Sequence, residues 1–245
     1  MVVQRNSATL PTEQDRLAAI LELRSSLRSL THGLRLEAPR RDVVSTSISS
    51  LDAILPERGL LRGTLSEWIS AEAGGGAASL AMQVARQSQR EGPLIIVDRY
   101  RQFYAPAIFA AGVRSADVVL VRPESRAHEL WAIEQSLKCP GIGAVLSRID
   151  FLKPQEFRRL QLAAESGTAI GLLLRSATAQ NYSGWADIRL LVSPCMSPLR
   201  AFSRRVAVRC VYAKGGLAGQ TIELDICDET GAVRLAAGFS DPAAE

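Results

Sequence analysis

Side chains that carry chemistry are scarce in this chain of 245 residues. It has 2 histidines and 4 cysteines, and no two cysteines form a CxxC pair. A zinc site needs cysteine and histidine clustered at short spacings, and Ser-His-Asp or Cys-His catalysis needs a histidine beside the nucleophile. The sequence therefore predicts no metal site and no hydrolase of these types. Four reduced thiols are typical of a cytosolic protein.

Long apolar runs are also absent. None approaches the roughly 20 residues that span a bilayer, and the first residues, MVVQRNSATLPTEQD, contain no apolar signal core. We therefore expect a cytoplasmic location and no membrane partner. With 47% apolar and 22% charged residues, the composition favours one globular domain with extensions.

Lysine is rare among the basic residues. Only Lys138, Lys153 and Lys214 are lysines, so 29 − 3 = 26 basic residues are arginine, and the formal net charge is +4. Arginine is the better residue for bidentate pairing with phosphate or carboxylate. The charge allows a nucleic acid or an acidic protein as partner without identifying either.

The pattern of the middle of the chain alternates between strand and helix. Continuous apolar strands with short connections favour an α/β fold with a mostly parallel sheet flanked by helices. The expected strands are 64–70, 93–98, 117–123, 142–147 and 169–176, and the expected helices are 78–91, 105–112, 124–137 and 154–167. Residues 204–213 and 220–227 flank a glycine-rich turn and predict a C-terminal β-hairpin extension, with a short third strand in 232–239.

An amphipathic helix is predicted before this core, over residues 12–30, and residues 31–50 have the composition of a linker. Such a helix can pack on its own domain or dock on another subunit or partner, so a homo-oligomer stays open. The predicted organisation is an N-terminal helix and linker (1–44), the core (45–198) and a basic hairpin with a tail (199–245). The apolar stripe of the helix consists of Leu17, Ile20, Leu21, Leu27 and Leu30.

The loop after the first core strand lies where a phosphate-binding loop would lie. That motif, GxxxxGK[ST], uses backbone N–H groups, a lysine and a magnesium-holding hydroxyl. Here Gly74, Gly75 and Gly76 are present, but Ala71 replaces the first glycine of the motif, and Ala77 and Ala78 replace the lysine and the hydroxyl residue. Since charge-assisted hydrogen bonds contribute about 1.5–3 kcal/mol each, we expect no nucleotide cofactor at this loop.

Segments on both sides of the loop resemble the RecA family. They are Ser50-Leu51-Asp52, Gly59-Leu60 with Gly63, and the LAMQV helix segment 80–84. The resemblance implies a RecA-like fold. Two catalytic positions of that family are also changed, because Tyr100 stands where the glutamate is expected and Ser147-Arg148 follows the strand that should end in aspartate. Asp150 comes late and is interpreted as a helix-capping or surface residue.

Within this superfamily the chain is most similar to ImuA-type proteins of bacterial mutagenesis cassettes, relatives of SulA-type division inhibitors. The similarity covers roughly residues 45–228 and rests on the segments 131–137, 143–146, 157–165 and 171–175, and on the hairpin after Pro198-Leu199-Arg200. It implies a non-catalytic accessory protein of DNA-damage-induced translesion synthesis. The implied partners are an ImuB-type polymerase homologue and an error-prone replicative-type polymerase. An ATPase with an atypical loop and a SulA-type inhibitor are the alternatives.

Two further groups are candidate sites for partner or DNA binding. A basic window without acidic residues contains Arg200, Arg204, Arg205, Arg209 and Lys214. It is interpreted either as a phosphate-binding or acidic-partner surface or as a solvated edge of the hairpin. Tyr182 and Trp185 follow a core strand, where they could stack on bases or cap the core.

Overall fold

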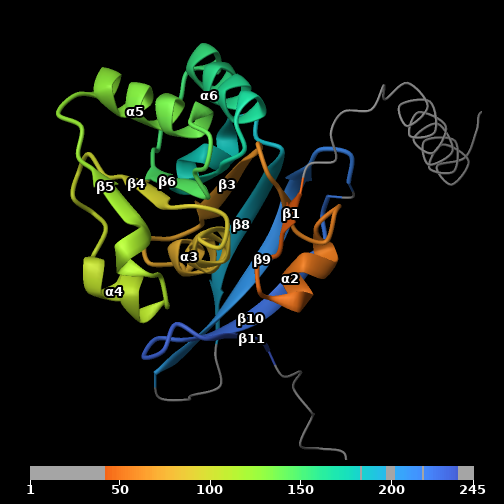
Figure 1. The fold of residues 1–245 in the computed structure, drawn as a ribbon. Helices are drawn as coiled ribbons and strands as arrows, with labels where there is room; N and C mark the ends of the chain where they lie inside the picture. Colours follow the sequence, from red (N-terminus) through yellow and green to blue (C-terminus); the bar gives the residue numbers. More distant parts are fainter. Residues whose placement is uncertain (1–41, 183, 197–201, 217, 237–245) are drawn as a thin grey trace, which may run out of the picture. The chain divides into compact units, whose positions relative to one another are not determined.

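The apolar segments form the strands of a central sheet in the computed structural model, which describes residues 42–182, 184–196, 202–216 and 218–236. The helix predicted over 12–30 and Arg200 lie outside these residues. The described part contains a two-stranded sheet of β1 (Val43–Val44) and β2 (Leu60–Leu61), and a nine-stranded sheet (Figure 1).

The larger sheet is parallel over six strands. Their order is β8 (Ile188–Cys195), β3 (Leu65–Ser70), β7 (Ile170–Arg175), β6 (Ala144–Arg148), β4 (Leu94–Val97) and β5 (Val118–Val121). Strand β4, with the sequence LIIV, is buried along its whole length, as expected for a strand covered on both faces. Because these strands are parallel, the carboxyl ends of β3, β7, β6 and β4 lie at one edge of the sheet.

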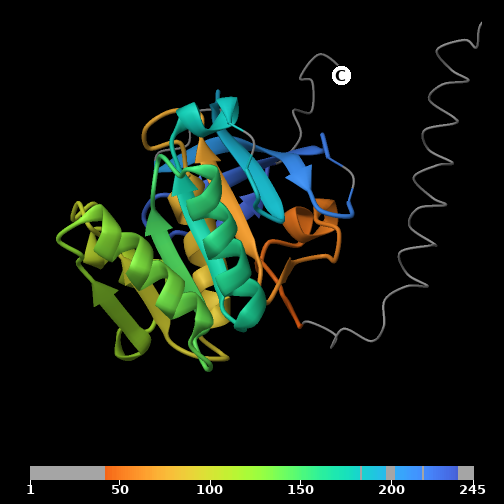
Figure 2. The same ribbon diagram turned by 90° about the horizontal axis from the view of Figure 1, so that it is seen from above.

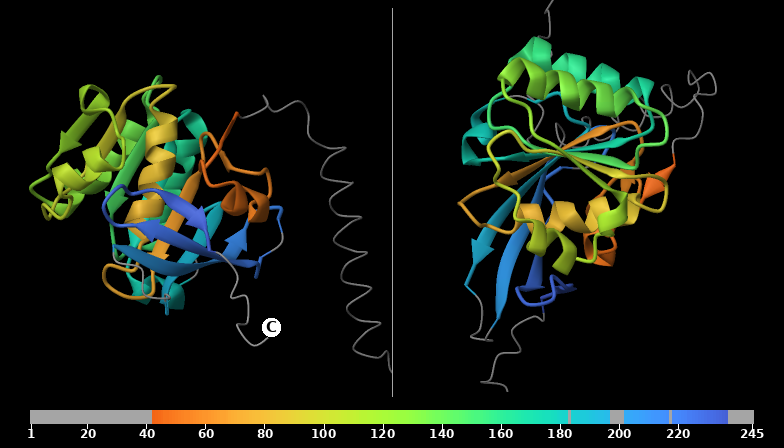
Figure 3. Two further views of the ribbon diagram at one scale, coloured as in Figure 1. Left: turned by 90° about the horizontal axis from the view of Figure 1, so that it is seen from below. Right: turned by 60° about the vertical axis from the view of Figure 1, so that its left-hand side comes forward.

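The predicted C-terminal hairpin continues this sheet rather than standing apart from it. Strand β9 (Ser203–Ala213) pairs antiparallel with β8, and β10 (Thr221–Cys227) and β11 (Val233–Leu235) follow in antiparallel register. Figure 3 shows these strands on the side of the sheet that carries α3. Buried side chains of β9 and β10, among them Val206 and Ile226, join the same core cluster as α3.

Helices cover both faces of the parallel strands. On one face α3 (Ala77–Ser88) packs through Leu80, Ala81 and Val84, together with the short helices α2 (Ser49–Ile54) and α4 (Ala105–Ala110). On the other face α5 (Arg126–Lys138) and α6 (Pro154–Ser166) lie side by side (Figure 2). Phe157 and Leu160 of α6 are buried in the second core cluster.

Two expectations need correction. Residues 31–50 were predicted to be a linker, but their described part contains β1 and the beginning of α2. Strand β8 was missed, because its sequence IRLLVSPC has an arginine near one end and a proline near the other. Tertiary pairing on both sides, with β3 and β9, holds it in the sheet.

Within the part of the chain that the structure describes, no helix has the length and apolar character needed to cross a membrane.

Candidate functional site: the degenerate loop and the carboxyl edge of the sheet

The loop between β3 and α3 bends at two of its glycines. Gly74 and Gly76 adopt φ values of 75° and 93°, a region that favours glycine. The N–H of Gly75, however, donates to the carbonyl of Glu72 within the loop (3.1 Å). One of the donors that a phosphate cradle would offer is therefore already used.

The alanines at the changed positions bring no polar group to the loop. Ala77 is the first residue of α3 and is buried, and Ala78 is partly buried. The N–H of Ala71 donates to the carbonyl of Val192 in β8 (2.8 Å). Methyl groups at 77 and 78 supply neither the charge nor the metal-binding hydroxyl that the motif requires.

The C-terminal hairpin closes over this loop. A side chain at Gly76 would meet Val206 Cγ1 of β9 and Ile226 Cδ1 of β10, each 3.1 Å from an ideal Cβ position. Arg204 of β9 donates from Nη1 to the Gly74 carbonyl (2.7 Å) and from Nη2 to Ser79 Oγ (3.0 Å). The loop is thus bound by the hairpin through both apolar packing and hydrogen bonds.

Residues at and near the other family positions contribute to local structure. Asp98, directly after β4, accepts hydrogen bonds from the backbone N–H groups of Gln102 (2.8 Å) and Phe103 (3.2 Å) and so shapes the following loop. Tyr100 in that loop is 62% exposed. Ser147 is buried in β6 and donates to the Val97 carbonyl (3.0 Å). Asp150 is exposed and accepts from the Ser176 N–H (2.8 Å) rather than capping a helix.

The basic window is not the free positive surface that its sequence suggested. Acidic residues from other segments pair with three of its members: Arg204 with Asp228 (3.0 Å), Arg205 with Asp225 (2.8 Å), and Lys214 with Asp187 (3.3 Å). Arg205 is only 5% exposed. Arg205 and Arg209 lie on the same face of β9, because the register with β10 is unbroken between them. On that face Arg205 is buried and bonds both carboxylate oxygens of Asp225. Arg209 is exposed, as expected.

The two aromatic residues after β7 lie at the surface and do not cap the core. Tyr182 is 56% exposed and meets the Phe151 ring edge-on, with ring centroids 6.3 Å apart. Trp185 is 51% exposed, and the guanidinium of Arg158 lies 5.9 Å from its ring centroid. Arg126 lies at the same distance from the Phe151 ring. Aromatic and arginine side chains thus contact one another at the surface in two groups, one around Phe151 and one at Trp185.

Sequence reasoning missed a buried charge network on β3. Glu67 is 1% exposed and pairs with Arg175 of β7 and with Arg189 of β8. The two arginines also donate to the carbonyls of Asp150 (3.0 Å) and Ala179 (2.7 Å), and so tie the loops after β6 and β7 to the sheet. The available signal was a glutamate inside the apolar strand TLSEWIS.

No described His, Cys, Asp and Glu side chains gather in threes at a place that could hold a metal ion. The four cysteines are free thiols, and Cys210 is the buried one.

This arrangement defines the class of the protein. A parallel sheet with a glycine-rich loop between β3 and α3, helices on both faces and the strand order β8-β3-β7-β6-β4 is a RecA-like α/β fold. The crystal structure of the RadB recombinase superposes with a TM-score of 0.60 and 13% sequence identity, covering 79% of this chain and 100% of that one. The fold predicted from the sequence is confirmed.

Among individual proteins, the chain is similar to Protein ImuA of Caulobacter vibrioides. The identity is 28% over 148 residues, which is 58% of this chain and 59% of the relative, and the same values hold for the protein from a second strain. The match thus spans about three fifths of the length of these relatives. No protein-family model matches the chain. The predicted resemblance to ImuA-type proteins is confirmed by this similarity.

Proposed function

We propose that the chain is a non-catalytic, RecA-like adaptor that acts in DNA-damage-induced translesion synthesis by binding other proteins. The similarity to Protein ImuA and the RecA-like fold support the link to this process. The partners that this resemblance implies are an ImuB-type polymerase homologue and an error-prone replicative-type polymerase. We propose both of these partners and the absence of catalysis.

The contact between Arg204 and the degenerate loop carries the non-catalytic part of the proposal. An arginine from elsewhere in the chain could in principle replace the missing lysine. The donors of Arg204, however, reach Gly74 and Ser79, and Asp228 balances its charge. A phosphate group would have to compete with these bonds and displace the hairpin packing at Gly76. These costs add to the loss of the lysine and of the metal-holding hydroxyl.

The β5 end of the sheet supplies a surface suited to a protein partner. Strand β5 is the last strand of the described sheet, and its Val119 and Leu120 are 49% and 40% exposed. Trp131 on α5 and Phe109 on α4 are 61% and 44% exposed. Apolar side chains this exposed are typical of interaction surfaces when several gather on neighbouring elements.

The deciding experiment measures partner binding and nucleotide binding together. The purified chain is titrated against an immobilised ImuB-type homologue, with and without MgATP, and against MgATP alone by calorimetry. We expect partner binding that MgATP does not change, and no saturable heat at millimolar nucleotide. Micromolar ATP affinity or MgATP-dependent turnover would instead support the atypical ATPase, and binding to a division-polymerising protein would support the SulA-type alternative.

Contact with single-stranded DNA is a second candidate function, favoured by the grouping of Phe151, Tyr182 and Trp185 with Arg126 and Arg158. Base stacking on exposed aromatic rings and pairing of arginine with phosphate are the usual means of such binding. Fluorescence anisotropy with a labelled oligonucleotide tests it. Affinity should fall with salt and drop further in a Trp185→Ala variant; binding that is unaffected by this change would remove the aromatic surface from the proposal.

A further inference from the structure

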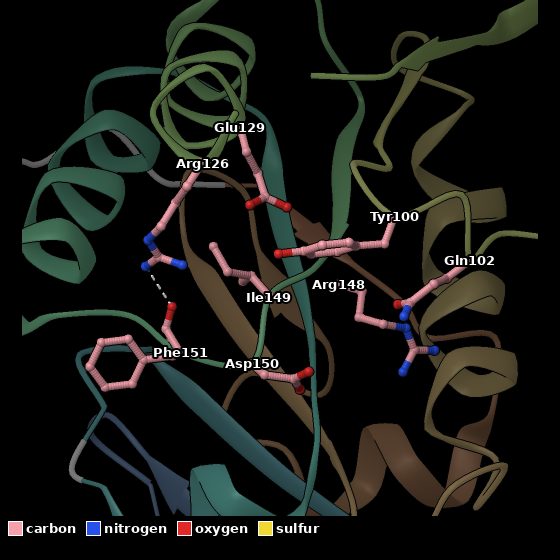
Figure 4. Close-up of a pocket in the computed structure, with 8 residues that line it drawn as sticks. All are labelled: Tyr100, Gln102, Arg126, Glu129, Arg148, Ile149, Asp150 and Phe151. Atoms are coloured by element: carbon pink, nitrogen blue, oxygen red, sulfur yellow. Dashed lines mark hydrogen bonds between the residues drawn. The ribbon is translucent and has the colours of Figure 1, made fainter. Parts of the chain in front are cut away.

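A separate pocket of about 340 Å³ opens at the carboxyl ends of β4 and β6, beside the first turns of α5 (Figure 4). Its walls come from the loops that follow the two strands and from α5, and none of its lining residues belongs to the degenerate loop. The volume is in the range of pockets that hold small molecules. The pocket is therefore a candidate ligand site separate from the degenerate loop, and its lining includes Tyr100 and Arg148, which stand at or beside catalytic positions of the RecA resemblance.

The walls of this pocket are held in place by the protein itself. Asp98 fixes the loop after β4 through the N–H groups of Gln102 and Phe103. On the opposite side, Asp150 accepts from the N–H of Ser176 and thereby ties the loop after β6 to the end of β7. A pocket held in this way loses little conformational entropy when a ligand enters.

Glu129 of α5 brings a carboxylate to the pocket at a cost to folding. Its side chain is 2% exposed and points into the pocket (Figure 4), and its Oε1 has no hydrogen-bond partner among the described residues. The nearest cation is Arg99, 3.8 Å from Oε2. Burial raises the pKa of Glu129, and Arg99 and Arg126 lower it by less. Buried carboxylates that are only partly compensated by neighbouring cations gather at functional sites.

Arg148 supplies an uncompensated charge of the opposite sign. It ends β6, and neither a hydrogen bond nor an ion pair reaches its guanidinium from the described residues, although its Nε is buried. Arg126, by contrast, is already paired with Glu156 (2.7 Å) and with the Phe151 carbonyl (2.7 Å). Glu129 and Arg148 thus leave one negative and one positive group for a ligand to satisfy.

We propose that this pocket binds a zwitterionic group, in which an ammonium or guanidinium lies close to a carboxylate, as in an amino acid or in two oppositely charged side chains of a peptide. Glu129 binds the cation, and Arg148 binds the carboxylate in two-pronged fashion. The rings of Tyr100 and Phe151, 62% and 51% exposed, border the site and can face the cation. Tyr100 also covers the approach to Glu129 (Figure 4). Arg99 donates to its hydroxyl (3.0 Å) and lies 4.9 Å from its ring centroid, so a ligand at Glu129 has to displace this contact.

Calorimetry on the full chain tests this with probes that carry both kinds of charge or only one. L-arginine carries a carboxylate beside two cationic groups, agmatine keeps both cations but lacks the carboxylate, and valerate keeps the carboxylate but lacks both cations. A Gly-Arg-Asp-Gly peptide with blocked termini carries the two charges on its side chains, and so distinguishes binding of a protein segment from binding of a free amino acid. We expect L-arginine or the peptide to bind roughly tenfold or more tightly than agmatine and valerate. If neither L-arginine nor the peptide gives a saturable heat of binding, the proposal is overturned.

Two substitutions assign the roles. Glu129→Gln should weaken the zwitterionic probe roughly tenfold and leave valerate unchanged, whereas Arg148→Gln should weaken it similarly and leave agmatine unchanged. Glu124→Gln, at an exposed position just before α5, is the matched control. Because Arg99 compensates the buried carboxylate only in part and Oε1 has no partner among the described residues, Glu129→Gln should keep or raise the melting temperature. A fall of several degrees would show that Glu129 is a structural partner of Arg99, and it would overturn the proposal.

Discussion

Arg204 of β9 donates a hydrogen bond of 2.7 Å to the Gly74 carbonyl, and so joins the last strands of the sheet to the loop after its first core strand. The two residues are 130 positions apart. Removing this side chain with Arg204→Ala should cost about 1–2 kcal/mol in the free energy of unfolding, because Gly74 and Ser79 lose their donor. Urea denaturation measures the change. Arg209→Ala, on the same strand but exposed, should change it by less than about 0.5 kcal/mol; equal effects would contradict the assignment.

Restoring the motif residues should not restore an ATPase. We expect Ala77→Lys with Ala78→Thr to produce no MgATP turnover, because the RecA resemblance puts Tyr100 where a catalytic carboxylate is expected and the hairpin packs against Gly76. Adding Arg204→Ala to the pair frees the Gly74 carbonyl but supplies no catalytic base. A phosphate-release assay on both variants checks this. Turnover above that of the unchanged chain in either variant would show that the loop alone limits activity.

Arg205 and Arg209 lie on the same face of β9 but should differ in their effect on stability. Arg205 is buried and bonds both carboxylate oxygens of Asp225, at 2.8 and 3.0 Å. These bonds raise the pKa of Arg205 above its ordinary value. Arg205→Ala should therefore lower the melting temperature by several degrees, and Arg209→Ala should leave it nearly unchanged. Differential scanning fluorimetry separates the two, and equal shifts would place Arg205 at the surface.

The contrast between β4 and β9 shows what the sequence could predict. The run LIIV predicts a strand buried on both faces, because apolar side chains alone decide its environment. The environment of Arg205 depends on the register that places Asp225 opposite it, 20 residues later. No local pattern records that register, so the fold was predicted well and the basic surface was not.

The ion-pair partners of Glu67 could not be predicted from the sequence either. Its partners Arg175 and Arg189 are 108 and 122 positions away, and they meet it only because β7 and β8 both pair with β3. The departure of residues 71–78 from the phosphate-loop motif could be read directly, because a motif lies within one short segment. The closure of the loop by Arg204 and the pocket around Glu129 required the packed structure.

Removing the charge of Glu67 should be strongly destabilising. Glu67→Gln would leave Arg175 and Arg189 without their anion, and Arg175 is only 4% exposed. Breaking a buried pair in this way costs about 3–5 kcal/mol. Chemical denaturation measures the loss, and Glu72→Gln, in the exposed part of the loop, is the control. A loss below about 1 kcal/mol would mean that water or rearrangement compensates the arginines.

Glu134 should make stability depend on pH in the acid range. It joins α5 and α6, and the hydrogen bond from Lys138 (2.7 Å), together with Arg159, lowers the pKa of Glu134 below its ordinary value of 4.5. A lowered pKa in the folded state means that the ionised form stabilises the fold above pH 4.5, and that this contribution is lost as the pH falls through the folded pKa.

The variant Glu134→Gln should therefore lower the free energy of unfolding at neutral pH, by about 1 kcal/mol at most because both cations are partly exposed. The difference from the unchanged chain should shrink as the pH falls below 4.5. Glu57→Gln, at an exposed position in the turn after α2, serves as control. A difference that stays constant with pH would mean that the substitution acts through packing rather than charge.

The exposed edge at β5 gives the sharpest test of the adaptor proposal. Val119 and Leu120 are 49% and 40% exposed, so Val119→Lys with Leu120→Lys should change stability little. If the ImuB-type homologue binds here, two desolvated lysines should weaken the complex at least roughly tenfold, because charged groups are excluded from interface cores. Biolayer interferometry with the immobilised homologue measures the affinity.

Leu235→Lys is the matched control, because Leu235 lies on β11, the strand at the other end of the same sheet, and is 63% exposed. Leu235→Lys places a lysine on an exposed edge strand and leaves β5 unchanged. If both variants weaken the complex equally, the effect comes from net charge rather than from a docking surface. If neither does, the partner binds elsewhere and β5 has no role in the complex. Loss confined to the β5 variant, with an unchanged melting temperature, assigns the interface.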